Sequence, residues 1–134
     1  MSENTLRRVL WADLIGSAAT TVVTIIMAGP LGDFLEIPAS VVAGVGVALI
    51  PWVGLLYLTV RRQPTRRGDV VSIVTGNVVW VLATATIIWG FPSALSPPGN
   101  RLLAIFGVGV LVLGLLEWRG LASLRPRVAM RQGR

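Results

Sequence analysis

Four blocks of apolar residues, each about as long as a membrane is thick, limit what this sequence can fold into. They cover approximately residues 9–28, 41–60, 70–89 and 102–118. Crossing ~30 Å of hydrocarbon takes roughly 20 mainly apolar residues in a helix. Only 13% of the chain is charged, whereas soluble domains average nearer a quarter. We therefore predict an all-α integral membrane protein with four transmembrane helices.

The arginines predict how these helices are oriented. All twelve basic residues are arginines, and eleven of them precede the first block, lie between the second and third, or follow the fourth. Only Arg101 falls in the other two loops. Because cytoplasmic segments of membrane proteins carry the excess of Lys and Arg, we expect both termini in the cytoplasm. The chain is then a single domain, residues 1–134, of two in–out–in hairpins packed as an antiparallel bundle. Residues 119–134 form its basic cytoplasmic tail.

Composition excludes several classes of function. The chain has no cysteine and no histidine, which removes disulfides, thiol nucleophiles and the usual haem, zinc and copper ligands. We therefore expect no metal and no cofactor. The net charge of +6 follows from topology, so we expect the lipid bilayer, not nucleic acid, as the partner of the arginines. The absence of lysine is typical of a GC-rich bacterial genome, which predicts a bacterial cytoplasmic (inner) membrane.

Two segments of the chain echo each other. Thr24-Ile25-Ile26 followed by Pro30 matches Thr86-Ile87-Ile88 followed by Pro92, and Gly-Val-Gly-Val occurs from Gly44 and again from Gly107. A parallel internal repeat would place its pseudo-twofold axis along the membrane normal. Chance is the alternative, because membrane helices use Val, Ile, Thr and Gly heavily.

Three strongly polar residues lie inside the predicted spans, in the cytoplasmic leaflet: Asp13, Asn77 and Glu117. A charge in a span costs at least roughly 2.5–3.5 kcal/mol at its centre and less near its ends. We therefore expect Asp13 to face inward, toward Asn77, a threonine or water. Its carboxyl is then either protonated and donating a hydrogen bond, or ionised against an arginine, for which the candidates are Arg8, Arg62 and Arg119.

Other residues extend this patch. Ser17 shares a helix face with Asp13, and Trp80 lies one turn from Asn77, where it would wall a pocket. The candidate ligand site is thus Asp13, Ser17, Asn77, Trp80 and Glu117. The alternative is a polar clamp that only joins helices. For Glu117, which is near Arg119, we expect an ion pair at the membrane boundary.

Small residues at helical spacing predict close helix contacts. Gly44 and Ala48 form such a strip in the second block, and Gly107 and Gly114 form one in the fourth. In lipid, small residues let helix backbones approach each other. We expect these four residues to pack helices together, within the chain or against a partner.

Three functions suit these features. The first is a small transporter or binding protein for a lipophilic or cationic ligand, working as a homo-oligomer, with Asp13 exchanging a proton. The second is an accessory subunit that docks a larger membrane complex through its glycine faces. The third is an acid–base enzyme, an isomerase or cyclase, that uses Asp13 or Glu117 on a lipophilic substrate. In length, number of spans and the acid in its first span, the chain is similar to the small multidrug resistance transporters. Their acid lies deeper and their other motifs are missing, so we do not assign it to them.

Overall fold

The computed structural model describes residues 2–124, which form helices and short connections. The elements are α1 (Glu3–Ile26), α2 (Ala28–Leu35), α3 (Ala39–Arg61), α4 (Arg67–Ala85), the π-helical turn η1 (Thr86–Gly90), α5 (Pro97–Leu121) and the 3-10 turn η2 (Ala122–Leu124). Four of the helices, with α4 continued by η1 and α5 by η2, are long and apolar enough to cross a membrane. The prediction of four such helices is therefore confirmed. Of the predicted tail, only residues 119–124 lie within the described part.

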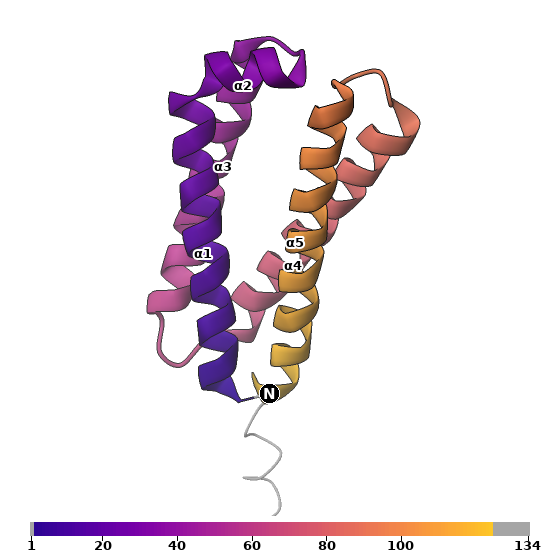
Figure 1. Ribbon diagram of the computed structural model, residues 1–134. Coiled ribbons are helices and arrows are strands. Elements are labelled where there is room, and N and C mark those ends of the chain that lie inside the picture. Colours follow the sequence, from indigo (N-terminus) through magenta and orange to yellow (C-terminus); the bar gives the residue numbers. More distant parts are fainter. Residues whose placement is uncertain (1, 125–134) are drawn as a thin grey trace, which may run out of the picture.

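The long helices pack in two pairs (Figure 1). α1 lies along α3, and α4 lies along α5. The two pairs meet mainly where α1 contacts α5. We call the end at which α1 and α4 begin, and α3 and α5 finish, the basic end, because Arg7, Arg62, Arg67 and Arg119 lie there. The opposite end is the α2 end.

The basic end is closed by apolar packing. Leu6 and Leu10 of α1 are buried against Leu56 of α3 and Val70 and Ile73 of α4. Gly120 of α5 makes part of this contact, because a Cβ at that position would overlap the Leu6 side chain. Side chains pack here from all four long helices, so this end holds the two pairs together.

Two arginines donate hydrogen bonds to backbone carbonyls where α3 and α5 finish, at the basic end. Arg7 of α1 donates hydrogen bonds to the carbonyl oxygens of Val60 (2.7 Å) and Arg62 (3.0 Å), where α3 finishes. Arg67 of α4 donates to the carbonyl of Leu121 (3.0 Å), where α5 finishes. Carbonyls in the last turn of a helix have no partner within it. Both arginines therefore satisfy such carbonyls on the neighbouring helix of their own pair.

At the α2 end, a serine at the start of α5 joins α5 to α2. Gly29, Pro30 and Gly32 are residues typical of a turn, but residues 28–35 form the short helix α2. Ser96, the N-cap of α5, donates from its hydroxyl to the carbonyl of Phe34 (2.6 Å) and from its amide to that of Leu35 (3.0 Å). Its hydroxyl oxygen also accepts from the amide of Gly99 (3.0 Å). This buried side chain links the two helix pairs at the end farthest from the apolar core.

Of the four small residues expected to pack helices together, two are buried within the chain and two are exposed. Gly107 and Gly114 are buried at the α4–α5 contact, Gly107 against Thr84 and Gly114 against Asn77. Gly44 and Ala48, however, are exposed, and a Cβ added to Gly44 would meet nothing within 4 Å. The glycine at the α1–α3 contact is Gly46, where a Cβ would overlap Thr24 and Ile25. The strip chosen from the sequence therefore faces outward on α3.

Candidate functional site

Three polar side chains from three helices meet inside the bundle. Asn77 of α4 donates from its amide nitrogen to Oδ2 of Asp13 on α1 (3.2 Å) and to Oε2 of Glu117 on α5 (3.1 Å). The exposed fractions of Asp13, Asn77 and Glu117 are 4%, 5% and 0%. We call these three residues the polar triad. Since one amide nitrogen bonds both carboxyl groups, the two acids are close neighbours.

Helix geometry explains why these residues meet. Asp13 and Asn77 are equally far along α1 and α4, both of which begin at the basic end, so they lie at equal depth. Glu117 lies one turn before the end of α5, which runs the other way. Gly114, one turn from Glu117, faces Asn77, since a Cβ there would lie 3.4 Å from the Asn77 Cβ, an ordinary van der Waals contact.

Asp13 makes a second hydrogen bond within its own helix. Ser17, one turn further along α1, donates from its hydroxyl to Asp13 Oδ1 (3.2 Å). Both oxygens of the Asp13 carboxyl therefore accept a hydrogen bond from a neutral donor.

The triad is separated from the basic end by an apolar layer. On α1, Leu6 and Leu10 come before Asp13, and on α4, Val70 and Ile73 come before Asn77. On α5, Leu121 follows Glu117. All five are buried, so water does not reach the triad along the bundle axis from this end.

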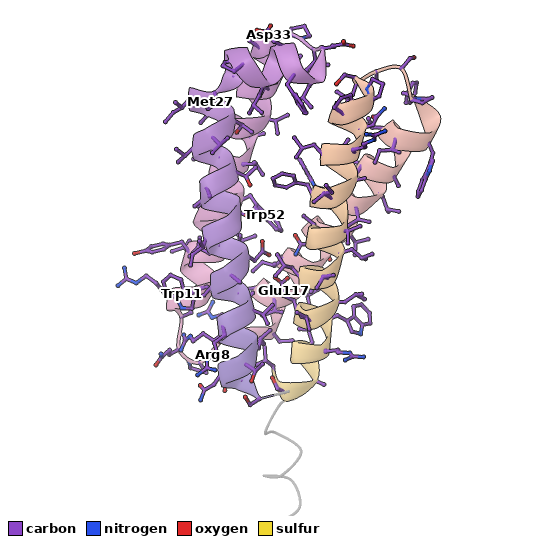
Figure 2. All side chains as sticks on the ribbon, viewed as in Figure 1. Arg8, Trp11, Met27, Asp33, Trp52 and Glu117 are labelled. Atoms are coloured by element: carbon purple, nitrogen blue, oxygen red, sulfur yellow. The ribbon has the colours of Figure 1, made fainter. Side chains whose placement is uncertain are left out.

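Neither the ion pair expected for Glu117 nor the one considered for Asp13 forms within residues 2–124. Among residues 2–124 the single salt bridge joins Arg62 to Asp69 (2.7 Å) at the exposed start of α4. Glu117 does not pair with Arg119 at the boundary. Its helix continues past it to Leu121, so Glu117 lies on the inner face and Arg119 on the outer. Figure 2 shows Glu117 between the helix pairs and Arg8 at the outside of the basic end. The expected Glu117–Arg119 pair was wrong.

A cavity of about 220 Å³ lies next to the triad. Asp13, Ser17 and Asn77 form its polar side. Trp52 of α3 and Trp80 of α4 lie in its wall, and the remaining lining comes from Gly76, Val79, Ala83 and Val110. The cavity thus combines one carboxyl group, a hydroxyl, an amide and two indole rings. Glu117 is not among the lining residues and lies behind Asn77.

Trp52 was not among the residues singled out for the site. Its ring crosses to α4 and lies against Gly76, where a Cβ would overlap it. Figure 2 shows its side chain between the helix pairs. Gly76 leaves room for the ring, but a glycine at this position does not by itself predict an aromatic neighbour.

Two buried polar atoms at this site have no hydrogen-bond partner within residues 2–124: Glu117 Oε1 and Trp80 Nε1. Buried polar atoms in proteins are nearly always paired, and an unpaired one costs about 1–3 kcal/mol. The site therefore has hydrogen-bonding capacity that the described chain does not use.

Chemically, the site can hold a proton and a negative charge away from water. Within residues 2–124, no group of three His, Cys, Asp or Glu side chains is placed to hold a metal ion. The donors around Asp13 are a hydroxyl and an amide, which stabilise charge without transferring protons at ordinary pH. Proton transfer would thus involve the two carboxyl groups and a bound molecule.

No protein-family model matches the chain, and comparisons with curated proteins and with solved structures found no match either. The function must therefore be argued from the site.

Proposed function

We propose that this protein is a small multi-pass protein of a bacterial inner membrane that binds a small ligand in the cavity beside Asp13, in the manner of a transporter or receptor. The cavity is the observation that carries the proposal. A clamp that only joined helices would be packed and dry, whereas Asp13, Ser17 and Asn77 border open space. Binding sites combine an apolar or aromatic lining with a few placed polar groups. The two tryptophans and the carboxyl of Asp13 fit that description.

Filling the cavity tests this proposal. Ala83 is exposed and lines the cavity, so Ala83→Phe should place a ring at its open side. Leu82→Phe is the matched control, because Leu82 is also exposed but does not line the cavity. We would screen small lipophilic compounds for those that raise the Tm of the purified protein in detergent. Such compounds should stabilise the wild type and Leu82→Phe but not Ala83→Phe. Equal stabilisation of all three proteins would place binding elsewhere and overturn the proposal.

For topology, we propose two in–out–in hairpins, α1 with α3 and α4 with α5, with the basic end in the cytoplasm. The arginines gathered there support this orientation. The chain lacks cysteine, so single cysteines report position directly. A membrane-impermeant maleimide should label Ser93→Cys in intact bacterial cells and Gln63→Cys only after lysis. The reverse pattern would invert the orientation.

We further propose that the two hairpins arose as a repeat. The hydrogen bonds of Arg7 and Arg67 support this, because each runs from the first helix of its pair to the end of the second. If each hairpin is a folding unit, residues 1–64 and 65–134 expressed as separate chains should assemble into a stable complex. Failure to assemble would count against two units.

A second role, as an accessory subunit or homo-oligomer, is favoured by one observation. Gly44 and Ala48 form a strip of small residues on the outer face of α3 that no helix within residues 2–124 covers. In lipid such a strip suits close approach by another helix. Gly44→Leu should then disrupt co-purification with a partner or with a second copy, while Gly54→Leu, another exposed glycine of α3, serves as control. If Gly44→Leu still co-purifies with the partner or second copy as the wild type does, this proposed role is overturned.

A further inference from the structure

We infer that the ligand of the cavity is a small organic monocation, such as a protonated amine, and that the two acids share one proton, held by Glu117. This inference rests on the proposed function and names the ligand class of the same site. Three independent features carry it: the number of acids, their unequal hydrogen bonding, and the aromatic wall.

The first feature is that two acids share the site and neither forms a salt bridge within residues 2–124. Asp13 and Glu117 bond the same Asn77 nitrogen. Three described arginines at the basic end have other partners: Arg7 bonds carbonyls at the end of α3, Arg62 pairs with Asp69, and Arg67 bonds the carbonyl of Leu121. The other four described arginines there are exposed: Arg8, Arg61, Arg66 and Arg119. α3 contributes apolar residues and Thr59 to this region, and no titratable group. Two like charges so close in apolar surroundings repel strongly, so the pair keeps one proton and one negative charge.

The second feature assigns the charge to Asp13. Asp13 accepts hydrogen bonds on both oxygens, from Ser17 (3.2 Å) and Asn77 (3.2 Å). Glu117 accepts one, on Oε2 (3.1 Å), while its Oε1 is buried without a partner among residues 2–124. Hydrogen bonds donated to a carboxyl group favour its charged form. The charge therefore lies on Asp13, which borders the cavity, and the proton on Glu117, which is fully enclosed.

The third feature is the wall of the cavity. Trp52 and Trp80 line it together with Asp13. Indole rings attract cations through their electron-rich faces, and tryptophan does so best of the aromatic residues. A carboxylate with two indole rings therefore matches an ammonium group attached to a small apolar body.

Size and charge limit this ligand further. A cavity of about 220 Å³ has room for a small molecule. The site holds one net negative charge, so a monocation leaves the occupied site neutral. A dication would introduce an uncompensated charge into an apolar region, which is costly.

Ligand class is tested with three matched probes: benzylamine as the monocation, benzyl alcohol as its neutral counterpart, and p-xylylenediamine as the dication. Binding to the detergent-purified protein would be measured by calorimetry. Benzylamine should bind most tightly. Asp13→Asn should weaken benzylamine binding by about thirtyfold or more, because it removes one partner of a buried charge pair. Asp33→Asn, which changes an exposed acid on α2, should leave it unchanged.

The outcomes separate the two proposals. Tighter binding of benzyl alcohol than of benzylamine would overturn the monocation, while binding in the cavity would still stand. Equal loss of benzylamine binding in Asp13→Asn and Asp33→Asn would overturn the role of Asp13. Binding of all probes that is insensitive to Ala83→Phe would overturn the proposed function itself.

The proton is tested in the unmodified protein by infrared spectroscopy. A protonated carboxyl group absorbs separately from an ionised one. Labelling with ¹³C-glutamate should shift the band of the protonated group, because Glu117 is the single buried glutamate in residues 2–124. Labelling with ¹³C-aspartate should leave the band in place. A shift with aspartate instead, or no such band at all, would overturn the assignment of the proton to Glu117.

Discussion

The two halves of this bundle are held together in different ways. In the half at the basic end, leucines, valines and isoleucine from all four long helices interlock and leave no side chain of the core exposed. In the half toward the α2 end, each helix keeps its own partner through small residues such as Gly46 and Gly107, and the two pairs are joined at the far end by Ser96. The polar triad lies where one kind of packing gives way to the other.

This difference shows how a chain in lipid can build a cavity. Lipid tails are as apolar as leucine, so burying a side chain between helices brings little hydrophobic gain, and association depends on close packing. Where interlocking packing stops, the pairs separate and space remains. Polar groups at that boundary, such as Asp13, face the space rather than the lipid.

The largest loss of stability should come from disrupting the packed half where Gly120 of α5 lies against the Leu6 side chain of α1. Gly120→Leu would drive a side chain into Leu6, and overpacking of this kind should lower the free energy of unfolding by about 3 kcal/mol or more. Gly109→Leu is the control, because a Cβ at Gly109 meets nothing within 4 Å. The measurement is unfolding in mixed micelles with increasing SDS, followed by circular dichroism. If both variants unfold alike, the basic end is not the packed half.

A smaller effect should follow from making a hole in the same half. Leu56→Ala removes a fully buried side chain and leaves a cavity, at about 2 kcal/mol of unfolding free energy. Leu58→Ala, on the same helix but exposed, should change stability by less than about 0.5 kcal/mol. The same SDS titration compares them. Similar losses of unfolding free energy in both variants would mean that Leu56 does not lie on the buried face of α3.

Removing the centre of the triad should cost less again. Asn77→Ala takes away both hydrogen bonds to the acids, and hydrogen bonds between membrane helices contribute about 0.6–1.7 kcal/mol each. We expect a loss of about 1–2 kcal/mol, with Thr75→Ala, an exposed position on α4, near zero. An increase in stability for Asn77→Ala would show that the triad is strained for function rather than stabilising.

The smallest effect is expected at the α2 end. Ser96→Ala removes the hydrogen bond to Phe34 and the cap of α5, a loss of about 1 kcal/mol. Ser93→Ala, in the same exposed loop, is the control. Hydrogen exchange at the amides of residue 96 and Gly99 should rise in Ser96→Ala, while exchange in the packed half stays as in the wild type. Faster exchange throughout would mean that the two ends are not independent.

The spans could be predicted from the sequence because hydrophobic length alone decides them. The buried face of each span could not, since lipid-facing and inward-facing positions are both apolar in a membrane helix. Gly44 and Gly46 illustrate this: two glycines two residues apart point to different sides of α3, and nothing in the local pattern says which one meets α1. α2 was missed because Gly29, Pro30 and Gly32 suggest a turn, whereas packing of Gly32 against Ile37 and Ala39 supports a helix.

The site was partly predictable for a related reason. Asp13 and Asn77 are strongly polar residues deep in apolar spans. Because exposing them to lipid is costly, their side chains are predicted to face the interior of the bundle. Glu117 lies next to Trp118 and close to Arg119, a combination typical of a membrane boundary, and only the continuation of α5 to Leu121 reveals its burial. The contribution of Trp52 depends on how α3 crosses α4, which local sequence does not encode.

The attachment of the helix pairs at both ends has a consequence for any binding measurement. With the leucine core at one end and Ser96 at the other, we expect the cavity to open through the flank of the bundle. The proposed ligand would then dissolve in the bilayer before it binds. Its occupancy will follow its concentration in the lipid phase, so affinities quoted per litre of water will change with the amount of membrane or detergent in the sample.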